Sequence, residues 1–426
     1  MDTTPALPPS KIVKKIFDEV HGYIEITDVE KELIDTPIFQ RLRFIKQLAA
    51  AWLVYPGATH TRFSHSLGAM HVMGMVASRL YSIGYISNRD DVQLLRIAAL
   101  LHDIGHMPYS HATELYYRKK LGIGHEDLSE LIVRENPDIK AVLINYGFDP
   151  QEVVAVMRGR HREPLYNQLV SGDLDVDRID YLLRDSLHTG VAYGVIDIHR
   201  IVSTLCIDGE GNLAILEKGL EAVENFYLAR LYMYRAVYYH KTIVGFEILI
   251  RKIYEELSAR IANEFFFTSM SEIRRAIRDG SIVFWNDAWL YGVMVRALRD
   301  PNIDENVKEL IRMFLSRRGY KTVIDLSKMV SDSEEEVRHH DLENIVEKLR
   351  GIGIDDVEVF VDDIKIVDDV HVQPRVILRR GASVPVSMVE NSVVKTLPRK
   401  FLVRRIYVLD RYVAKARDLV RKIGLR

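Results

Sequence analysis

Apolar residues recur at three- and four-residue spacings along the first part of the chain, from Lys11 to about Gly190. This spacing places apolar side chains on one face of a helix. Proline, alone or beside glycine, interrupts the pattern repeatedly, as is typical of loops. We therefore predict a series of helices joined by short loops and opened by a strand or turn over residues 22–26. The interruptions are Pro37, Pro56–Gly57, Pro108, Pro137, Pro150 and Pro164.

Two short runs rich in β-branched and aliphatic residues follow, at 204–207 and 213–216. The segment between them, 208–212, is rich in glycine and acidic residues, so the three together predict a small β-hairpin. A helical pattern then extends over 220–262. Further helices are predicted as far as about Arg317.

The pattern changes near Arg318–Gly319. Beyond it, Ser333 followed by three glutamates resembles a capping box and predicts a helix that ends near Gly351. Four β-rich runs and a basic helix over 410–423 complete the chain. We predict a mainly α fold, with a helical domain over 1–317 and a smaller α+β domain over 318–426. The β-rich runs are 357–361, 364–367, 375–378 and 401–408.

Composition limits the possible classes of protein. The 426 residues are 48% hydrophobic, which is enough for a large core. The 58 basic and 60 acidic side chains give a formal charge of −2, so general affinity for nucleic acid is not expected. The charged content of 28%, nearly balanced in sign, is typical of a heat-adapted protein.

The single cysteine, Cys206, excludes an internal disulfide and favours a reducing compartment. The proline-rich start, Met1–Ser10, lacks the apolar segment of a signal peptide. The sequence contains no run of roughly 18 apolar residues, the length that a membrane-spanning helix needs. We therefore expect a cytoplasmic protein without membrane contact.

The pair His102–Asp103 follows the apolar run 94–101. Adjacent helical residues point about 100° apart, so both reach one ion only where a helix ends. Gly105 and Pro108 supply that end. Imidazole and carboxylate are ligands for Zn, Mn, Fe, Ni and, less readily, Mg. The alternative is that His102 caps the helix and Asp103 makes a surface ion pair.

The segment 171–185 holds five aspartates among aliphatic residues, too acidic for an ordinary buried helix and too apolar for an exposed one. At helical spacing Asp177, Tyr181 and Asp185 share one face. An acidic first turn that favours the helix dipole is the alternative. Together with an upstream histidine, these segments predict one metal site. Its candidate ligands are His65, His102, Asp103 and Asp177.

Further histidines and arginines surround these candidates. Imidazoles near a metal can donate protons or pair with phosphate oxygens. Arginines neutralise polyphosphate charge. Any one of these side chains could instead be structural, and the tyrosine-rich segment 227–239 also matches a core helix. The residues are His106, His111, His125, Arg62, Arg178 and Arg230.

The order of His65, the His102–Asp103 pair and Asp177 resembles the HD superfamily of metal-dependent phosphohydrolases. Segments 56–68, 101–111 and 175–181 resemble its deoxynucleoside triphosphate triphosphohydrolase branch. That branch includes bacterial and archaeal dNTPases and the vertebrate enzyme that joins a sterile-alpha-motif domain to an HD domain. The resemblance runs from about Lys14 into the 250s, and we expect no sterile-alpha-motif domain in this sequence.

The resemblance implies a multi-helix HD core with one divalent metal per site, which the sequence does not identify among Mn, Mg, Fe, Ni and Zn. It places His106, His111 and His125 against the phosphates, with His111 near the α-phosphate. It makes Arg62, Arg178 and Arg230 the partners of phosphate oxygens. The implied sugar contacts are Gln47, Leu48, Tyr181 and Asp185, the last two reading the 3′-hydroxyl, and Tyr238, which closes against a 2′-hydroxyl.

Three departures from the vertebrate enzyme leave base and sugar selectivity open. Tyr234 replaces a histidine, Arg178 a lysine, and Ala49–Ala51 a glycine run. The resemblance also implies a homo-oligomer, a dimer or tetramer, and the C-terminal domain is its natural contact element. An activating nucleotide is a further implied partner. It would bind through Asp35, Gln40 and Arg43, which equally fit a helix cap and an ordinary amphipathic helix.

We therefore expect metal-dependent hydrolysis of a deoxynucleoside triphosphate to the deoxynucleoside and inorganic triphosphate. A metal lowers the pKa of bound water to roughly 7, which makes water a nucleophile at neutral pH. One alternative is an HD phosphohydrolase acting on GTP, a cyclic nucleotide or a guanosine alarmone. Another is a non-catalytic protein that binds nucleotides or nucleic acid.

Overall fold

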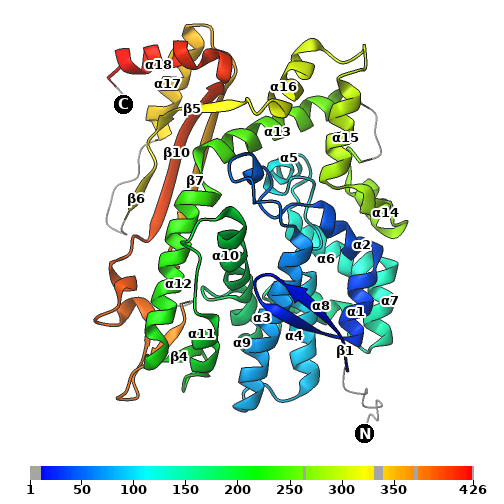
Figure 1. Cartoon of the computed structure of the whole chain (residues 1–426), viewed down its shortest axis with the longest axis vertical. Helices are drawn as coiled ribbons and strands as arrows, with labels where there is room; N and C mark the ends of the chain where they lie inside the picture. Colours follow the sequence, from blue (N-terminus) through cyan, green and yellow to red (C-terminus); the bar gives the residue numbers. More distant parts are fainter. Residues whose placement is uncertain (1–10, 262–264, 331–338, 369–372, 425–426) are drawn as a thin grey trace.

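The computed structural model describes residues 11–261, 265–330, 339–368 and 373–424. Its first half is a series of helices, as predicted (Figure 1). Four of the interrupting prolines occupy the first turn of a helix, where the missing N–H has no intrahelical partner to lose. The helices are α1 (Asp28–Asp35), α2 (Pro37–Gln40), α3 (Arg62–Ser82), α4 (Arg89–Leu101), α5 (His111–Leu121), α6 (His125–Glu135), α7 (Pro137–Asn145), α8 (Pro150–Met157), α9 (Pro164–Ser171), α10 (Val176–Thr189) and α11 (Ile198–Thr204).

An antiparallel hairpin precedes these helices. The predicted strand over 22–26 is present as β2 (Gly22–Thr27), and it pairs with β1 (Ile12–Asp18). The helical interpretation from Lys11 onward was therefore wrong until α1. The apolar spacing in this segment is short enough to fit either structure, and pairing with β2 decides it.

The helical stretch predicted over 220–262 is two helices. α12 (Leu220–Met233) passes into a π-helical turn, Tyr234–Tyr238, and α13 (Lys241–Arg260) starts a new helix. The imidazole of His240 caps α13 by accepting from the backbone N–H of Thr242 at 3.2 Å. π-Helical turns are frequent at functional sites. The later helices are α14 (Met270–Arg278), α15 (Asp287–Ala297) and α16 (Glu305–Leu315).

A four-stranded antiparallel sheet lies at the end of the molecule opposite the first hairpin (Figure 1). Its central strand is β10 (Lys400–Leu409), which pairs with β7 (Val357–Lys365) along one side and with β5 (Tyr320–Asp325) and β6 (Lys328–Val330) along the other. The runs predicted over 357–361 and 364–367 form the single strand β7, except that residues 366 and 367 lie beyond its end. α17 (His339–Gly351) and α18 (Val413–Lys422) accompany this sheet.

The helix before Gly351 ends where predicted, whereas the capping box proposed at Ser333 lies outside the described residues. The predicted hairpin of β3 (Leu205–Ile207) and β4 (Leu213–Leu216) is confirmed. β8 (Arg375–Ile377), parallel to β4, and β9 (Ser383–Pro385) extend it into a second four-stranded sheet.

One hydrophobic core contains residues from both sides of position 318, from Ile24 to Leu409. α13 and β5 pack closely, because a Cβ on Gly245 would lie 2.4 Å from the carbonyl oxygen of Tyr320. The mainly α core and the α+β C-terminal region are thus confirmed. The division into two domains at 318 stays a prediction.

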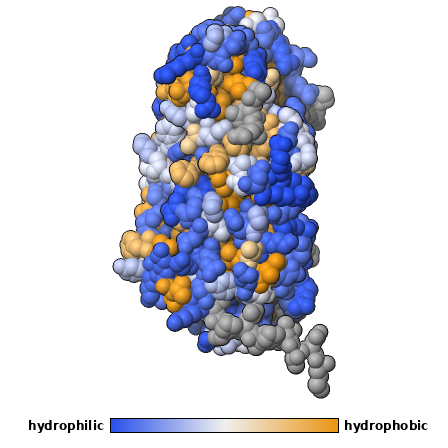
Figure 2. Space-filling view, turned by 90° about the vertical axis from the view of Figure 1, so that its right-hand side faces the viewer, coloured by the Kyte–Doolittle hydropathy of each residue, from blue (hydrophilic) through white to orange (hydrophobic). Residues whose placement is uncertain are grey.

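The exposed surface is predominantly polar on the face shown in Figure 2, where apolar residues form small separate groups. Among the described residues, no helix combines the length and apolar character needed to cross a bilayer.

Candidate metal centre and surrounding pocket

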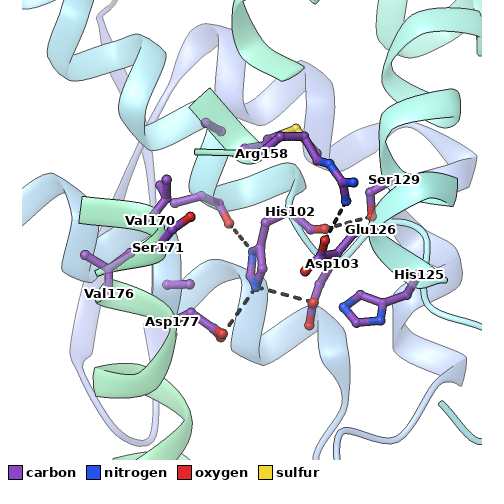
Figure 3. A pocket seen from close by; sticks show the side chains of 14 residues that line it. His102, Asp103, His125, Glu126, Ser129, Arg158, Val170, Ser171, Val176 and Asp177 are labelled. Carbon is purple, nitrogen blue, oxygen red and sulfur yellow. Dashed lines mark hydrogen bonds and ion pairs between the residues drawn. The ribbon is translucent and has the colours of Figure 1, made fainter. Parts of the chain in front are cut away.

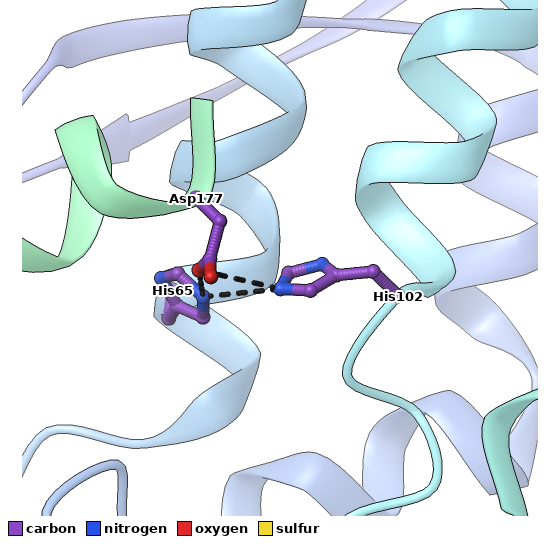
Figure 4. A group of neighbouring side chains, drawn as sticks. All are labelled: His65, His102 and Asp177. Carbon is purple, nitrogen blue, oxygen red and sulfur yellow. Dashed lines mark hydrogen bonds and ion pairs between the residues drawn. The ribbon is translucent and has the colours of Figure 1, made fainter. Parts of the chain in front are cut away.

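Three of the four predicted metal ligands, His65, His102 and Asp177, converge where three helices meet (Figure 4). Nε2 of His65, at the start of α3, lies 2.9 Å from Oδ1 of Asp177 in the first turn of α10. Nε2 of His102, just after α4, lies 3.3 Å from Nε2 of His65 and 3.5 Å from Oδ1 of Asp177. Asp103 completes the group, with Oδ1 3.4 Å from Nε2 of His102. We call these four residues the imidazole–carboxylate cluster.

The two imidazoles are oriented for metal binding. Nδ1 of His102 lies 2.7 Å from the carbonyl oxygen of Ala99, which can only accept, so this nitrogen carries the proton. Nδ1 of His65 donates in the same way to Oδ2 of Asp180 at 2.8 Å. Both Nε2 lone pairs therefore point into the cluster. Two such imidazoles with two carboxylates fit a divalent cation, with partners behind the ligands that fix their tautomers.

Asp180 was not among the predicted site residues. Its buried carboxylate also contacts Nε2 of His21 at 2.6 Å and accepts from Nε of Arg184 at 2.9 Å. Burial alone raises the pKa of Asp180, but Arg184 and the two imidazoles outweigh it and hold the pKa well below its usual range. Gly68 is required beside it, because a Cβ there would lie 1.8 Å from Oδ1. The unusual acidity of segment 171–185 was the only sequence signal.

The three further histidines lie in a row beside the cluster. Nε2 of His106 is 3.1 Å from Oδ1 of Asp103, and its ring stacks on His125 at 4.0 Å. Nδ1 of His125 and Nδ1 of His111 lie 3.0 and 3.1 Å from the buried carboxylate of Glu114. Burial raises the pKa of Glu114, but hydrogen bonds from the two imidazoles outweigh it and lower the pKa. Glu114 is therefore ionised and anchors both rings, a role that the sequence did not reveal.

A cavity of about 180 Å³ opens beside the cluster (Figure 3). Its lining includes His102, Asp103 and Asp177 of the cluster and Arg158, the residue after α8. Nη1 of Arg158 donates to Oε2 of Glu126 at 2.5 Å. The volume is below the roughly 300–1,000 Å³ of typical small-molecule pockets. It therefore accommodates only part of a nucleotide-sized ligand.

The predicted sugar contacts form a second group, farther along α10. Oδ2 of Asp185 accepts from the hydroxyl of Tyr238 at 2.8 Å, and the ring of Tyr181 meets that of Tyr238 edge to face at 5.6 Å. Oδ1 of Asp185 lies 2.6 Å from Nε2 of His60, which was not predicted. Among the described residues, the buried Oε1 of Gln47 has no hydrogen-bond partner. Leu48 is half-buried beside it and packs against the apolar side chains of the same loop.

Each predicted phosphate-binding arginine is held by a carboxylate. Nη1 of Arg62 lies 2.6 Å from Oδ2 of Asp103, inside the cluster. Nη1 of Arg178 lies 2.9 Å from Oδ2 of Asp175. These arginines contribute charge at the site, and their binding of phosphate stays a prediction.

The third arginine, Arg230, pairs with buried Asp173. Asp368, which follows β7 in the C-terminal region, approaches this pair as well. Its Oδ2 lies 3.6 Å from Nη2 of Arg230 and 3.9 Å from Nη2 of Arg178. Its backbone N–H donates to Oδ2 of Asp173 at 3.3 Å. The C-terminal region thus places a carboxylate against the two arginines.

The three residues implied for an activator lie together near α1 and α2. Nε of Arg43 donates to Oε1 of Gln40 at 2.7 Å, and its guanidinium lies over the ring of Phe63. Asp35 pairs instead with Lys31 at 2.8 Å. Their part in nucleotide binding stays a prediction.

Two family models match this chain, one after the other along the sequence. The family described as HD domain matches residues 62–185, and the HD associated region matches 196–399. The chain is 32% identical over 327 residues to the uncharacterized protein YwfO of Bacillus subtilis, covering 75% of this chain and 74% of that protein. It is 41% identical over 243 residues to an uncharacterized protein of Methanocaldococcus jannaschii, covering 56% and 49%.

The chain is also 32% identical over 269 residues to deoxynucleoside triphosphate triphosphohydrolase SAMHD1 of Homo sapiens, covering 54% of this chain and 42% of that enzyme. Among solved structures, a phosphohydrolase from Bacteroides thetaiotaomicron superposes with a TM-score of 0.76 at 27% identity, covering 93% of this chain and 99% of that one. A hypothetical protein from Aquifex aeolicus gives 0.77 at 26% identity, covering 96% and 99%.

The chain therefore belongs to the HD-domain phosphohydrolases that are related to dNTPases. It carries both the HD domain and the HD-associated region. It spans about half the length of several curated relatives.

Proposed function

We propose that this protein hydrolyses deoxynucleoside triphosphates to the deoxynucleoside and inorganic triphosphate. The proposal rests mainly on α10, because this one helix contributes Asp177 to the imidazole–carboxylate cluster and Asp185 to the group around Tyr238. Eight helical residues span about 12 Å, the scale of a sugar and its α-phosphate. The relationship to SAMHD1 supports the same substrate class.

The cluster would hold one divalent metal through Nε2 of His65 and His102 and the carboxylates of Asp103 and Asp177. A divalent metal held there supplies a Lewis acid that polarises a phosphoryl oxygen and makes water nucleophilic at neutral pH. Arg62 keeps Asp103 ionised through a 2.6 Å ion pair. For Asp177, burial raises the pKa, but the neighbouring imidazoles of His102 and His65 outweigh it and lower the pKa, so this carboxylate is also ionised.

Hydrolysis adds the oxygen of one water to the α-phosphorus and breaks its bond to the 5′-oxygen, which takes up a proton. His111 is the proposed donor, because its ring is 64% exposed and its Nδ1 is held by Glu114 at 3.1 Å. With Nδ1 held by that carboxylate, Nε2 would face the leaving oxygen. His106 and His125 would line the path of the phosphates.

The sugar would lie against Tyr181 and Tyr238, with its 3′-hydroxyl donating to Asp185. Tyr238 already donates its only hydroxyl proton to Asp185, so its ring would face the 2′-position. A 2′-hydroxyl there would lose water without gaining a partner. This arrangement favours deoxynucleotides over ribonucleotides.

A substrate panel tests the proposal. The purified protein is incubated with each dNTP, each NTP, a cyclic nucleotide and a guanosine alarmone, in Mn²⁺ or Mg²⁺. We expect dNTP turnover at least about tenfold faster than NTP turnover, from an unfavourable term of about 1.4 kcal/mol. Asp185→Asn should reduce dNTP turnover while metal binding is unchanged. Preference for another nucleotide would support a different HD phosphohydrolase, and binding without turnover a non-catalytic protein.

A further inference from the structure

A buried carboxylate of the HD-associated region joins two loops of the site. Asp287 is the first residue of α15 and is 3% exposed. Its Oδ2 accepts from the backbone N–H of Lys46 at 3.0 Å, and its Oδ1 accepts from that of Tyr109 at 2.7 Å. The residue after Lys46 is Gln47, a predicted sugar contact. The loop at Tyr109 leads into His111, the proposed proton donor.

Both loops are strained. In the part of the chain that the structure describes, four residues other than glycine have positive φ, and three of them lie in these loops: Ala49 at 43°, Tyr109 at 53° and Ser110 at 48°. The fourth, Arg317, donates through Nε to the carbonyl oxygen of Leu53, at the end of the first loop. Such a conformation costs roughly 1–2 kcal/mol per residue. It persists where surrounding contacts over-determine it, as at functional sites.

Arg41 joins the same region from the other side. Its buried guanidinium donates to the carbonyl oxygen of Trp285, two residues before Asp287, at 2.8 Å. It also donates to the carbonyl oxygens of Ile104 at 3.2 Å and His106 at 2.5 Å. The segment that begins α15 is therefore tied to the loop after His102–Asp103 at two points.

We infer that Asp287 is a positioning residue, which keeps the loops of Gln47 and His111 in place around the imidazole–carboxylate cluster. This inference rests on the proposed function. Asp287 acts through main-chain amides, and each of its two carboxylate oxygens accepts one N–H. A carboxylate is therefore needed at this position. An amide of the same shape would turn its own NH₂ toward one of the two donors and leave that N–H without an acceptor.

Asp287→Asn tests this role, with Asp208→Asn as the matched control. Asp208 is also buried and accepts from two backbone amides, those of Glu210 and Asn212, each at 2.9 Å. It lies in the β3–β4 turn rather than at the site. We expect Asp287→Asn to lower kcat at least tenfold and to lower the dNTP-to-NTP ratio of kcat/KM at least threefold. Metal stoichiometry stays at the wild-type value, and Asp208→Asn changes neither kinetic quantity by more than twofold.

An unchanged kcat and substrate ratio in folded Asp287→Asn would overturn the inference. So would equal losses of kcat in the two variants with an unchanged ratio, because that result indicates general destabilisation. Hydrogen exchange in the wild-type protein gives a test that needs neither a folded variant nor dNTP turnover. Amides of peptides covering 45–48 and 107–110 should exchange as slowly as those of core helix α4. Fast exchange there would contradict the positioning role of Asp287. If these amides are protected but no dNTP is turned over, the positioning of the two loops by Asp287 is supported and the proposed function is refuted.

Discussion

His65 and Asp180 are separated by 115 residues, yet Nδ1 of the imidazole donates to Oδ2 of the carboxylate over 2.8 Å. This bond fixes the tautomer that points Nε2 toward Asp177 and His102. Because Asp180 also contacts His21 and Arg184, the first hairpin and α10 jointly orient one candidate ligand. The metal chemistry that we propose depends on this orientation as much as on the ligands.

Asp180→Asn should weaken metal binding by about 10–100-fold, the usual effect of removing a partner behind a ligand. The amide accepts less strongly and no longer enforces the Nδ1–H tautomer of His65. Mn²⁺ titration by calorimetry measures the affinity, and circular dichroism verifies the fold. Asp208→Asn serves as the control. Wild-type affinity in a folded Asp180→Asn protein would show that this carboxylate is only structural.

Asp177→Ala should abolish both metal binding and turnover, because the cluster loses the carboxylate closest to Nε2 of His65. Elemental analysis after dialysis gives the metal content, and a dNTP assay gives the activity. Asp185→Asn is the matched control on the same helix and should retain metal. Full activity of Asp177→Ala would refute the ligand assignment.

Asp368→Asn should lower the KM for a triphosphate substrate. The carboxylate lies 3.6 Å from Arg230 and 3.9 Å from Arg178, where it would compete with phosphate oxygens. Removing a partly exposed charge of this kind changes the interaction by about 1 kcal/mol, or roughly fivefold in KM. Steady-state kinetics at low salt measure the change. A raised KM would instead assign Asp368 to holding the two arginines in place.

Glu247 on α13 predicts a pH dependence of stability. Burial raises the pKa of its carboxyl to about 7 in the folded protein, from 4.5. The neutral carboxyl therefore stabilises the fold fully below pH 4.5, and this contribution is lost as the pH rises through 7. Relative to Glu247→Gln, the wild type should lose about 2–3 kcal/mol between pH 4.5 and 8. Urea unfolding at both pH values measures this, and parallel pH profiles for the two proteins would contradict the assignment.

The features that depend on a local sequence pattern or a motif could be predicted from the sequence. It identified the helical series, the β3–β4 hairpin and the four residues of the imidazole–carboxylate cluster, which meet because each lies at a helix end. It missed β1, whose short apolar spacing fits a helix until the pairing with β2 is known. It also missed the break at His240, because the aromatic residues of the π-helical turn continue the apolar pattern.

The supporting carboxylates were beyond sequence reasoning for a different reason. Glu114, Asp180 and Asp287 resemble ordinary acidic residues in their local sequence. Asp287 accepts from an amide 178 residues away and Asp180 from a histidine 115 residues away, so only the fold reveals their partners. Glu114 differs from the other two in having a local partner, His111, three residues before it, but this spacing alone did not reveal its role.

Product analysis tests the central proposal most directly. Each dNTP is incubated with the Mn²⁺-loaded protein in water enriched in ¹⁸O. The products are then separated, and their masses are measured by mass spectrometry. We predict equal amounts of deoxynucleoside and inorganic triphosphate, with the heavy oxygen in the triphosphate. Release of pyrophosphate and monophosphate, heavy oxygen in the nucleoside, or no turnover of any dNTP would contradict the proposal.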